Sequence, residues 1–102
     1  MNAVIVGADR LGAIPERLSL HGISVIRHIS GRHVTHQRTS AFLPREADVL
    51  ILLTDFLSHN VMKAFRARAQ ECGLAVVACR RSASALESEL ARVQLQGATA
   101  GG

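Results

Sequence analysis

Apolar and polar residues alternate in blocks along this chain, and the blocks predict strands and helices that follow each other in turn. Ala3–Val6 is a continuous apolar run rich in β-branched residues, and Gly7 ends it. Short apolar runs of this kind are typical of parallel strands that are buried on both faces. Three similar runs predict further strands over Ile23–Ile29, Val49–Leu53 and Leu74–Cys79.

Segments with helical spacing separate these strands. The first helix has Pro15 in its first turn and stops at Gly22. We expect its buried side chains to be Ile14, Leu18 and Leu20. A short second helix over His33–Ala41 fits the length of the next connection, and Pro44 closes it.

Two further helices follow the third and fourth strands. Ser58 is a suitable N-cap for one of them, and Gly73 ends it. Its predicted inner face consists of Met62, Phe65, Ala69 and Cys72. The last helix begins near Ser82 or Ser84, where Ser84 and Glu87 have the spacing of a capping box. Its apolar positions are Leu86, Leu90 and Val93.

This alternation predicts one three-layer α/β domain over residues 1–96, with a flexible tail over 97–102. We expect a four-stranded parallel sheet in the order 2-1-3-4, which is a truncated flavodoxin-like or half-Rossmann arrangement. Ile23–Ile29 carries polar residues and is expected at one edge, whereas Val49–Leu53 is expected in the centre. Leu74–Cys79 is apolar throughout although it lies at the other edge, so we expect a homo-oligomer that buries this edge or the adjacent helices.

Composition limits the classes of function. The 102 residues are 48% hydrophobic and 20% charged, which indicates one ordered domain. With three Phe and no Trp or Tyr, the chain offers no aromatic platform for stacking bases, and it has no nucleic-acid-binding motif. The net charge is +4, and no acidic residue occurs between Arg17 and Arg45. Because clustered Arg side chains favour phosphates and carboxylates, we expect a small anionic partner rather than nucleic acid.

Two features bear on where the protein acts. Met1 is followed at once by the first predicted strand, without the segments of a signal peptide, and the longest apolar run is far too short to span a bilayer. We therefore expect a cytoplasmic protein that does not enter a membrane. Cys72 and Cys79 have no metal-ligand spacing, and we expect both to be buried as small apolar side chains.

The polar loops that follow the predicted strands all lie at one end of the sheet. In open parallel sheets, ligands bind beyond the carboxyl ends of the strands, where the strand order reverses. This rule gives the place of a site, and the Arg side chains of these loops suit phosphate, carboxylate or nucleotide as its ligand. Its candidate binding residues are Asp9, Arg10, Ser30, Arg32, His33, Thr54, Asp55, Ser58, His59, Arg81 and Ser82.

Two alternatives remain open from the residues alone. His33, His36 and His59, with Asp55, have the side chains of a zinc or iron site. A structural subunit without a ligand would instead use the polar loops to contact a neighbouring chain.

Asp55 and His59 could form an acid–base pair, but no nucleophile motif is present, so an enzyme is not indicated. The residues identify no cofactor.

Short motifs at the ends of the predicted strands carry a resemblance. The first strand ends in Gly7–Arg10, the third leads to Asp55–His59, and the fourth runs into Arg80–Ser82. In these motifs the chain resembles the bacterial domain-of-unknown-function family 2325, and Ser30–His33 is similar to one subgroup of it. The likeness extends to about Leu90. It implies a cytoplasmic bacterial protein with a Rossmann-like fold, and it implies no activity.

Overall fold

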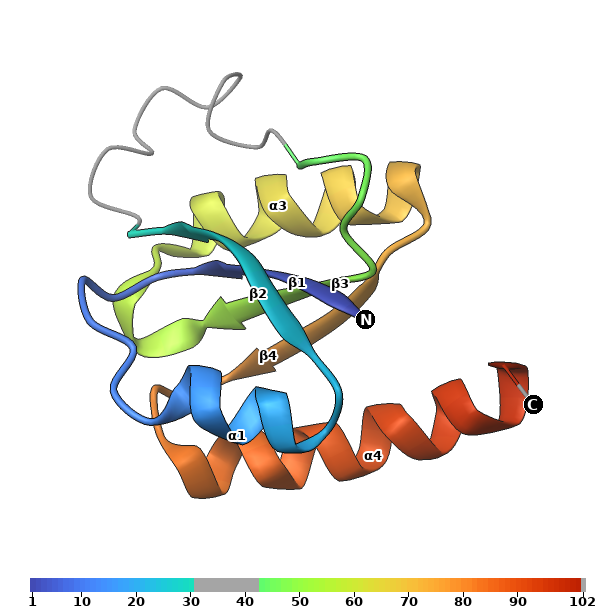
Figure 1. Ribbon diagram of the computed structural model, residues 1–102. Helices are drawn as coiled ribbons and strands as arrows, with labels where there is room; N and C mark the ends of the chain where they lie inside the picture. Colours follow the sequence, from blue (N-terminus) through green and yellow to red (C-terminus); the bar gives the residue numbers. More distant parts are fainter. Residues whose placement is uncertain (31–42, 102) are drawn as a thin grey trace.

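A four-stranded parallel sheet forms the centre of the molecule, as the sequence predicted (Figure 1). The computed structural model describes residues 1–30 and 43–101, with side chains as far as Arg92. The strands are β1 (Asn2–Val6), β2 (Ser24–Ile29), β3 (Val49–Leu53) and β4 (Ala75–Cys79). Their order in the sheet is β2-β1-β3-β4, and each neighbouring pair is parallel. The predicted α/β class, strand order and half-Rossmann arrangement are confirmed.

Helices cover both faces of the sheet. Helices α1 (Ile14–Leu20) and α4 (Ala83–Gly101) lie on one face, and α3 (His59–Cys72) lies on the other (Figure 1). A single 3₁₀ turn, η1 (Thr54–Phe56), follows β3. The helix predicted over His33–Ala41 lies outside the described residues. None of the helices in the described part of the chain is long and apolar enough to cross a membrane.

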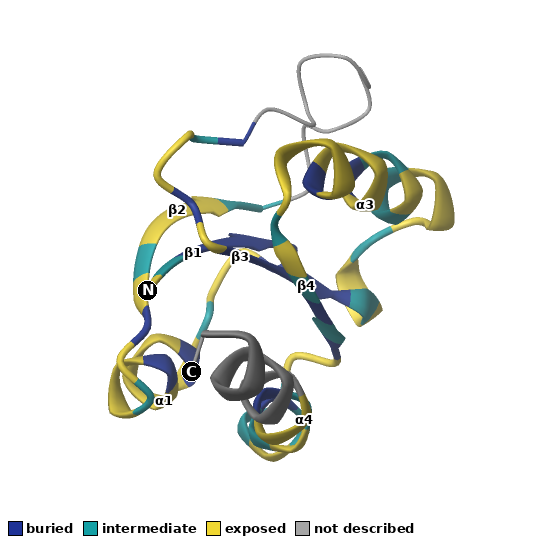
Figure 2. Ribbon diagram, turned by 90° about the vertical axis from the view of Figure 1, so that its right-hand side faces the viewer, coloured by how far each residue is buried: buried dark blue, intermediate teal, exposed yellow. Residues whose placement is uncertain are grey.

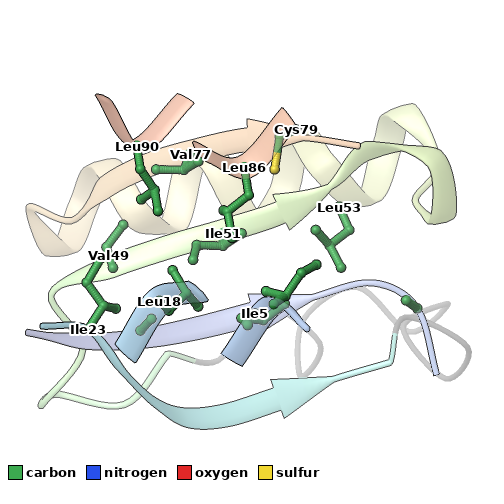
Figure 3. Close-up of a cluster of buried hydrophobic side chains, with 13 residues drawn as sticks. Ile5, Leu18, Ile23, Val49, Ile51, Leu53, Val77, Cys79, Leu86 and Leu90 are labelled. Carbon is green, nitrogen blue, oxygen red and sulfur yellow. The ribbon is translucent and has the colours of Figure 1, made fainter. Parts of the chain in front are cut away.

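The central strands β1 and β3 contribute to a core on each face because successive side chains of a strand point to opposite sides. Figure 2 shows both strands buried, apart from the half-buried start of β1 at Asn2. Ile5, Ile51 and Leu53 pack with residues of α1 and α4, and Figure 3 shows this cluster. Val4, Leu50 and Leu52 pack on the other side of the sheet against Phe65 and Ala69 of α3.

Two predicted core positions are wrong. Leu20 is 76% exposed, since it follows the buried Leu18 by two residues and therefore points about 200° away around the helix. Cys72 is exposed because it is the last residue of α3, where the chain turns at Gly73 toward β4. Met62 is half-buried, while Phe65, Ala69 and Cys79 are buried as expected.

The ends of α4 refine the prediction for the last helix. The main-chain N–H of Ala85 donates to Ser82 Oγ over 3.4 Å, so Ser82 caps this helix and Ser84 lies inside it. The helix continues to Gly101, past the point where the tail over 97–102 was expected to begin. The flexibility of that tail stays a prediction.

Candidate functional site

Three connections meet at the carboxyl edge of the sheet, where the sequence placed the candidate site. They are the loop after β1, the η1 turn after β3 and the segment after β4. Together they enclose a shallow depression with a volume of about 260 Å³. Its lining residues are Ala8, Asp9, Arg10, Phe56 and Arg81, and we call it the rim depression.

The loop after β1 leaves the strand in an uncommon backbone conformation. Gly7 has a φ of +114°, and Ala8 follows with a φ of +64°. A Cβ atom on Gly7 would lie 3.0 Å from both the Cβ and the carbonyl oxygen of Leu53, so only glycine fits there. Ala8 is buried, and a left-handed alanine persists only where its surroundings hold it in place.

His28 of β2 makes a contact with this loop that the sequence analysis missed. Its Nε2 atom lies 3.1 Å from the carbonyl oxygen of Gly7 and 2.9 Å from that of Ala8. From the residues alone, His28 is only one of the polar residues of a predicted edge strand. The parallel register that pairs His28 with Ile5 brings it close to the end of β1, and that register could not be read from the residues alone.

Arg81 connects the other two segments to the loop after β1. Its main-chain N–H donates to Asp55 Oδ1 over 3.0 Å, which ties the segment after β4 to the η1 turn. Its side-chain Nη1 donates to the carbonyl oxygen of Arg10 over 3.3 Å. The guanidinium carbon lies 5.9 Å from the centre of the Phe56 ring, within the range of a cation–π contact. Arg81 therefore lies across the rim depression with its position fixed by three neighbours.

The polar groups of the rim depression favour an anion. The carbonyl oxygens of Gly7, Ala8 and Arg10 each accept a hydrogen bond from a side chain. The main-chain N–H groups of Ala8 and Arg10, in contrast, have no acceptor within residues 1–30 and 43–101. Arg10 and Arg81 bring two guanidinium groups to a lining that holds one carboxylate, that of Asp9. Donors and positive charge therefore predominate.

The structure brings together only part of the predicted binding set. Asp9, Arg10, Asp55 and Arg81 meet around the rim depression. Two serines act as helix caps instead. Ser58 Oγ accepts from the N–H of Val61 over 3.2 Å, and Ser82 caps α4. Ser30 and Thr54 are half-buried at the ends of β2 and β3. Arg32, His33 and His36 lie outside the described residues.

The proposed acid–base pair is not formed in the part of the chain that the structure describes. Asp55 uses Oδ1 to bind the main chain of Arg81, and His59 is an exposed residue at the start of α3 without a hydrogen bond to Asp55. Burial, with the nearby carboxylates of Glu89 and Asp55, raises the pKa of the Cys79 thiol to about 11. That thiol is therefore protonated at neutral pH and is a poor nucleophile.

No three His, Cys, Asp or Glu side chains within residues 1–30 and 43–101 are grouped so as to hold a metal ion. His33 and His36 belong to the segment that is not described, so the predicted metal set of His33, His36, His59 and Asp55 stays a prediction.

Phe56 is a second residue that the sequence analysis missed. It is 49% exposed and lines the rim depression under the Arg81 guanidinium. Because the chain has so few aromatic residues, the sequence predicts no aromatic side chain in the site. The position of Phe56 directly after Asp55, between a buried strand and a helix cap, is the feature that could have indicated it.

The fold and the arrangement of these loops define a small parallel α/β domain of the half-Rossmann type, with a polar site at the carboxyl edge of its sheet. The chain belongs to the family described as an uncharacterized protein conserved in bacteria, domain of unknown function 2325, whose model matches residues 2–93. The resemblance drawn from the strand-end motifs is thereby confirmed. No curated protein and no solved structure matches the chain.

Proposed function

We propose that this domain is a binding module that holds a small oxyanion in the rim depression. The observation that carries the proposal is the fixed position of Arg81. Its guanidinium lies across a loop whose carbonyl oxygens are occupied and whose N–H groups at Ala8 and Arg10 have no acceptor among the described residues. A guanidinium beside main-chain N–H groups is well suited to a phosphate or a carboxylate.

The residues at the rim depression have different roles in the proposed site. Arg10 and Arg81 supply positive charge, and the loop amides supply directed donors. Asp55 holds the main chain of Arg81 rather than the ligand. Phe56 supports the guanidinium from one side.

The size of the rim depression narrows the class of ligand. A volume of about 260 Å³ lies below the roughly 300–1,000 Å³ that is usual for sites of drug-sized molecules. Inorganic phosphate, a small carboxylate or the phosphate end of a nucleotide fits this space.

Calorimetric titration with inorganic phosphate tests the proposal. We expect saturable binding by the parent protein, and binding about ten- to one-hundredfold weaker for Arg81→Gln because a charge-assisted hydrogen bond is lost. Arg45→Gln is the matched control, since Arg45 is exposed in the turn before β3, at the opposite end of the sheet. A parent protein that does not bind phosphate, or equal affinities in parent and Arg81→Gln, would overturn the proposal.

We further propose that the module assembles with copies of itself through the outer edge of β4. This edge strand, Ala75–Cys79, carries no charged residue, whereas β2 at the other edge carries Arg27 and His28. A charged edge discourages pairing with another chain, and an uncharged one permits it. Two β4 strands can pair antiparallel about a twofold axis, which satisfies the outward main-chain groups of both.

We also propose that the protein is located in the cytoplasm. Cys72 and Cys79 are both free thiols, and free thiols are usual in reducing compartments.

A further inference from the structure

We infer that His28 is a positioning residue for the rim depression, which it does not itself line. The inference rests on the proposed oxyanion site and adds how one of its main-chain donors, the N–H of Ala8, is oriented. His28 lies near the end of the edge strand β2, and its ring contacts two carbonyl groups of the loop after β1.

The contact fixes which ring atom carries a hydrogen. Nε2 of His28 lies 3.1 Å from one carbonyl oxygen and 2.9 Å from another, those of Gly7 and Ala8. Carbonyl oxygens only accept, so Nε2 must be protonated and its N–H is shared between the two. One ring therefore holds two successive peptide groups.

The direction of these peptide groups follows from their geometry. In a trans peptide, the N–H points opposite to the C=O of the same unit, and no cis peptide occurs in the described part of the chain. With the carbonyls of Gly7 and Ala8 turned toward His28 on the β2 side, the N–H groups of Ala8 and Asp9 are turned away from β2.

The rim depression lies on the side to which these N–H groups turn. The strand order is β2-β1-β3-β4, so His28 and the residues after β3 and β4 are on opposite sides of the loop. Phe56 follows β3 and Arg81 follows β4, and both line the depression with Ala8 and Asp9. His28 thus directs the main-chain N–H of Ala8, which has no acceptor among the described residues, toward the place where Arg81 holds its guanidinium.

This arrangement also explains how an alanine keeps a left-handed conformation. Ala8 has a φ of +64°, which residues with a Cβ atom rarely adopt. When the His28 ring is removed, the Gly7 and Ala8 carbonyls are free to rotate, and a rotated carbonyl would present an oxygen where the anion is expected. The site would then lose the Ala8 donor and gain a repulsive group.

The first test is the protonation of the His28 ring in the protein without ligand. Imidazole ¹⁵N NMR is expected to show Nε2 carrying the hydrogen. The amide resonances of Ala8 and Asp9 are expected to shift in His28→Ala and to stay close to their parent positions in His28→Gln, whose side-chain amide can donate to the same oxygens. A neutral ring with its hydrogen on Nδ1, or unchanged Ala8 and Asp9 resonances in His28→Ala, would overturn the inference.

The second test is calorimetric titration of the same variants with inorganic phosphate. We expect His28→Ala to bind about three- to tenfold more weakly, the range expected for one net hydrogen bond, and His28→Gln to recover most of the affinity. His21→Ala is the matched control, because His21 contacts Glu87 of α4 and not the loop after β1. Far-UV circular dichroism confirms that each variant is folded.

The outcomes separate this inference from the function on which it rests. If the parent protein does not bind phosphate, the proposed function fails, while the ring protonation and the Ala8 and Asp9 resonances still decide the role of His28. If the parent binds phosphate and the folded His28→Ala variant binds it equally well, the positioning role fails and the oxyanion site stands.

Discussion

Gly7 is the single residue on which the shape of the site depends most. It has a positive φ, and the space where its Cβ would lie is taken by main-chain and side-chain atoms of Leu53 in the neighbouring strand. Close packing between β1 and β3 and the turn toward the rim depression therefore meet at one position. No other residue type satisfies both requirements.

Gly7→Ala should lower the free energy of unfolding by about 2–4 kcal/mol, because it combines left-handed strain with overpacking against a buried strand. Gly22→Ala separates the two effects. Gly22 also has a positive φ, of +74°, but no atom lies within 4 Å of its Cβ position. We expect that variant to lose only about 1–2 kcal/mol. Urea unfolding of both proteins measures the difference, and equal losses would contradict the packing argument.

At the scale of elements, α3 and α4 each begin with a serine that the sequence suggests both as a helix cap and as a ligand, whereas α1 begins after Ala13 without a side-chain cap. Ser58 accepts from the N–H of Val61, and Ser82 accepts from the N–H of Ala85. Each hydroxyl oxygen therefore accepts a hydrogen bond from the first turn of its own helix. Their role as helix caps therefore accounts for the contacts of both serines.

Ser82→Ala should lower the free energy of unfolding by about 0.5–1 kcal/mol, since it removes the cap of α4. Ser84→Ala should change it by less than about 0.5 kcal/mol, because Ser84 is exposed and lies within the helix, where alanine is favoured. Thermal or urea unfolding of the two variants compares them directly. A larger loss from Ser84→Ala would show that the helix begins at the predicted capping box instead.

The strands were predictable from sequence, and most of the loop contacts were not. Continuous apolar runs such as Val49–Leu53 have few alternatives to a buried parallel strand, and short connections then limit the strand order. Leu20 was wrongly predicted to be buried because it is apolar, although its angular position around α1 lies away from the buried Leu18. His28 and Phe56 were missed because each contacts a segment far away along the chain, and the strand pairing that brings the two segments together cannot be seen in either segment alone.

At the scale of the whole molecule, the two edges of the sheet differ in charge. β2 presents Arg27 and His28, while β4 has only apolar and small residues along Ala75–Cys79. In a sheet of four strands, half of the strands lie at an edge. The residues that each edge strand exposes therefore affect whether the protein associates with other copies of itself in solution.

Light scattering coupled to gel filtration should therefore find a dimer or larger assembly at micromolar concentration. Ala75→Lys should dissociate it, because a lysine on an edge strand opposes pairing with another chain. Ser24→Lys is the matched control, since Ser24 and Ala75 are both exposed first residues of edge strands. A monomeric parent protein, or an assembly lost in Ser24→Lys but kept in Ala75→Lys, would contradict pairing through β4.

The binding of an oxyanion at the carboxyl edge is the central claim, and an NMR titration tests it most directly. Amide resonances of the ¹⁵N-labelled protein would be followed as inorganic phosphate is added, with chloride at matched ionic strength as the control. We predict saturable shifts for Ala8, Arg10 and Arg81 with phosphate and not with chloride. Shifts that do not saturate, or that are confined to distant basic residues such as Arg45 and Arg66, would contradict the claim.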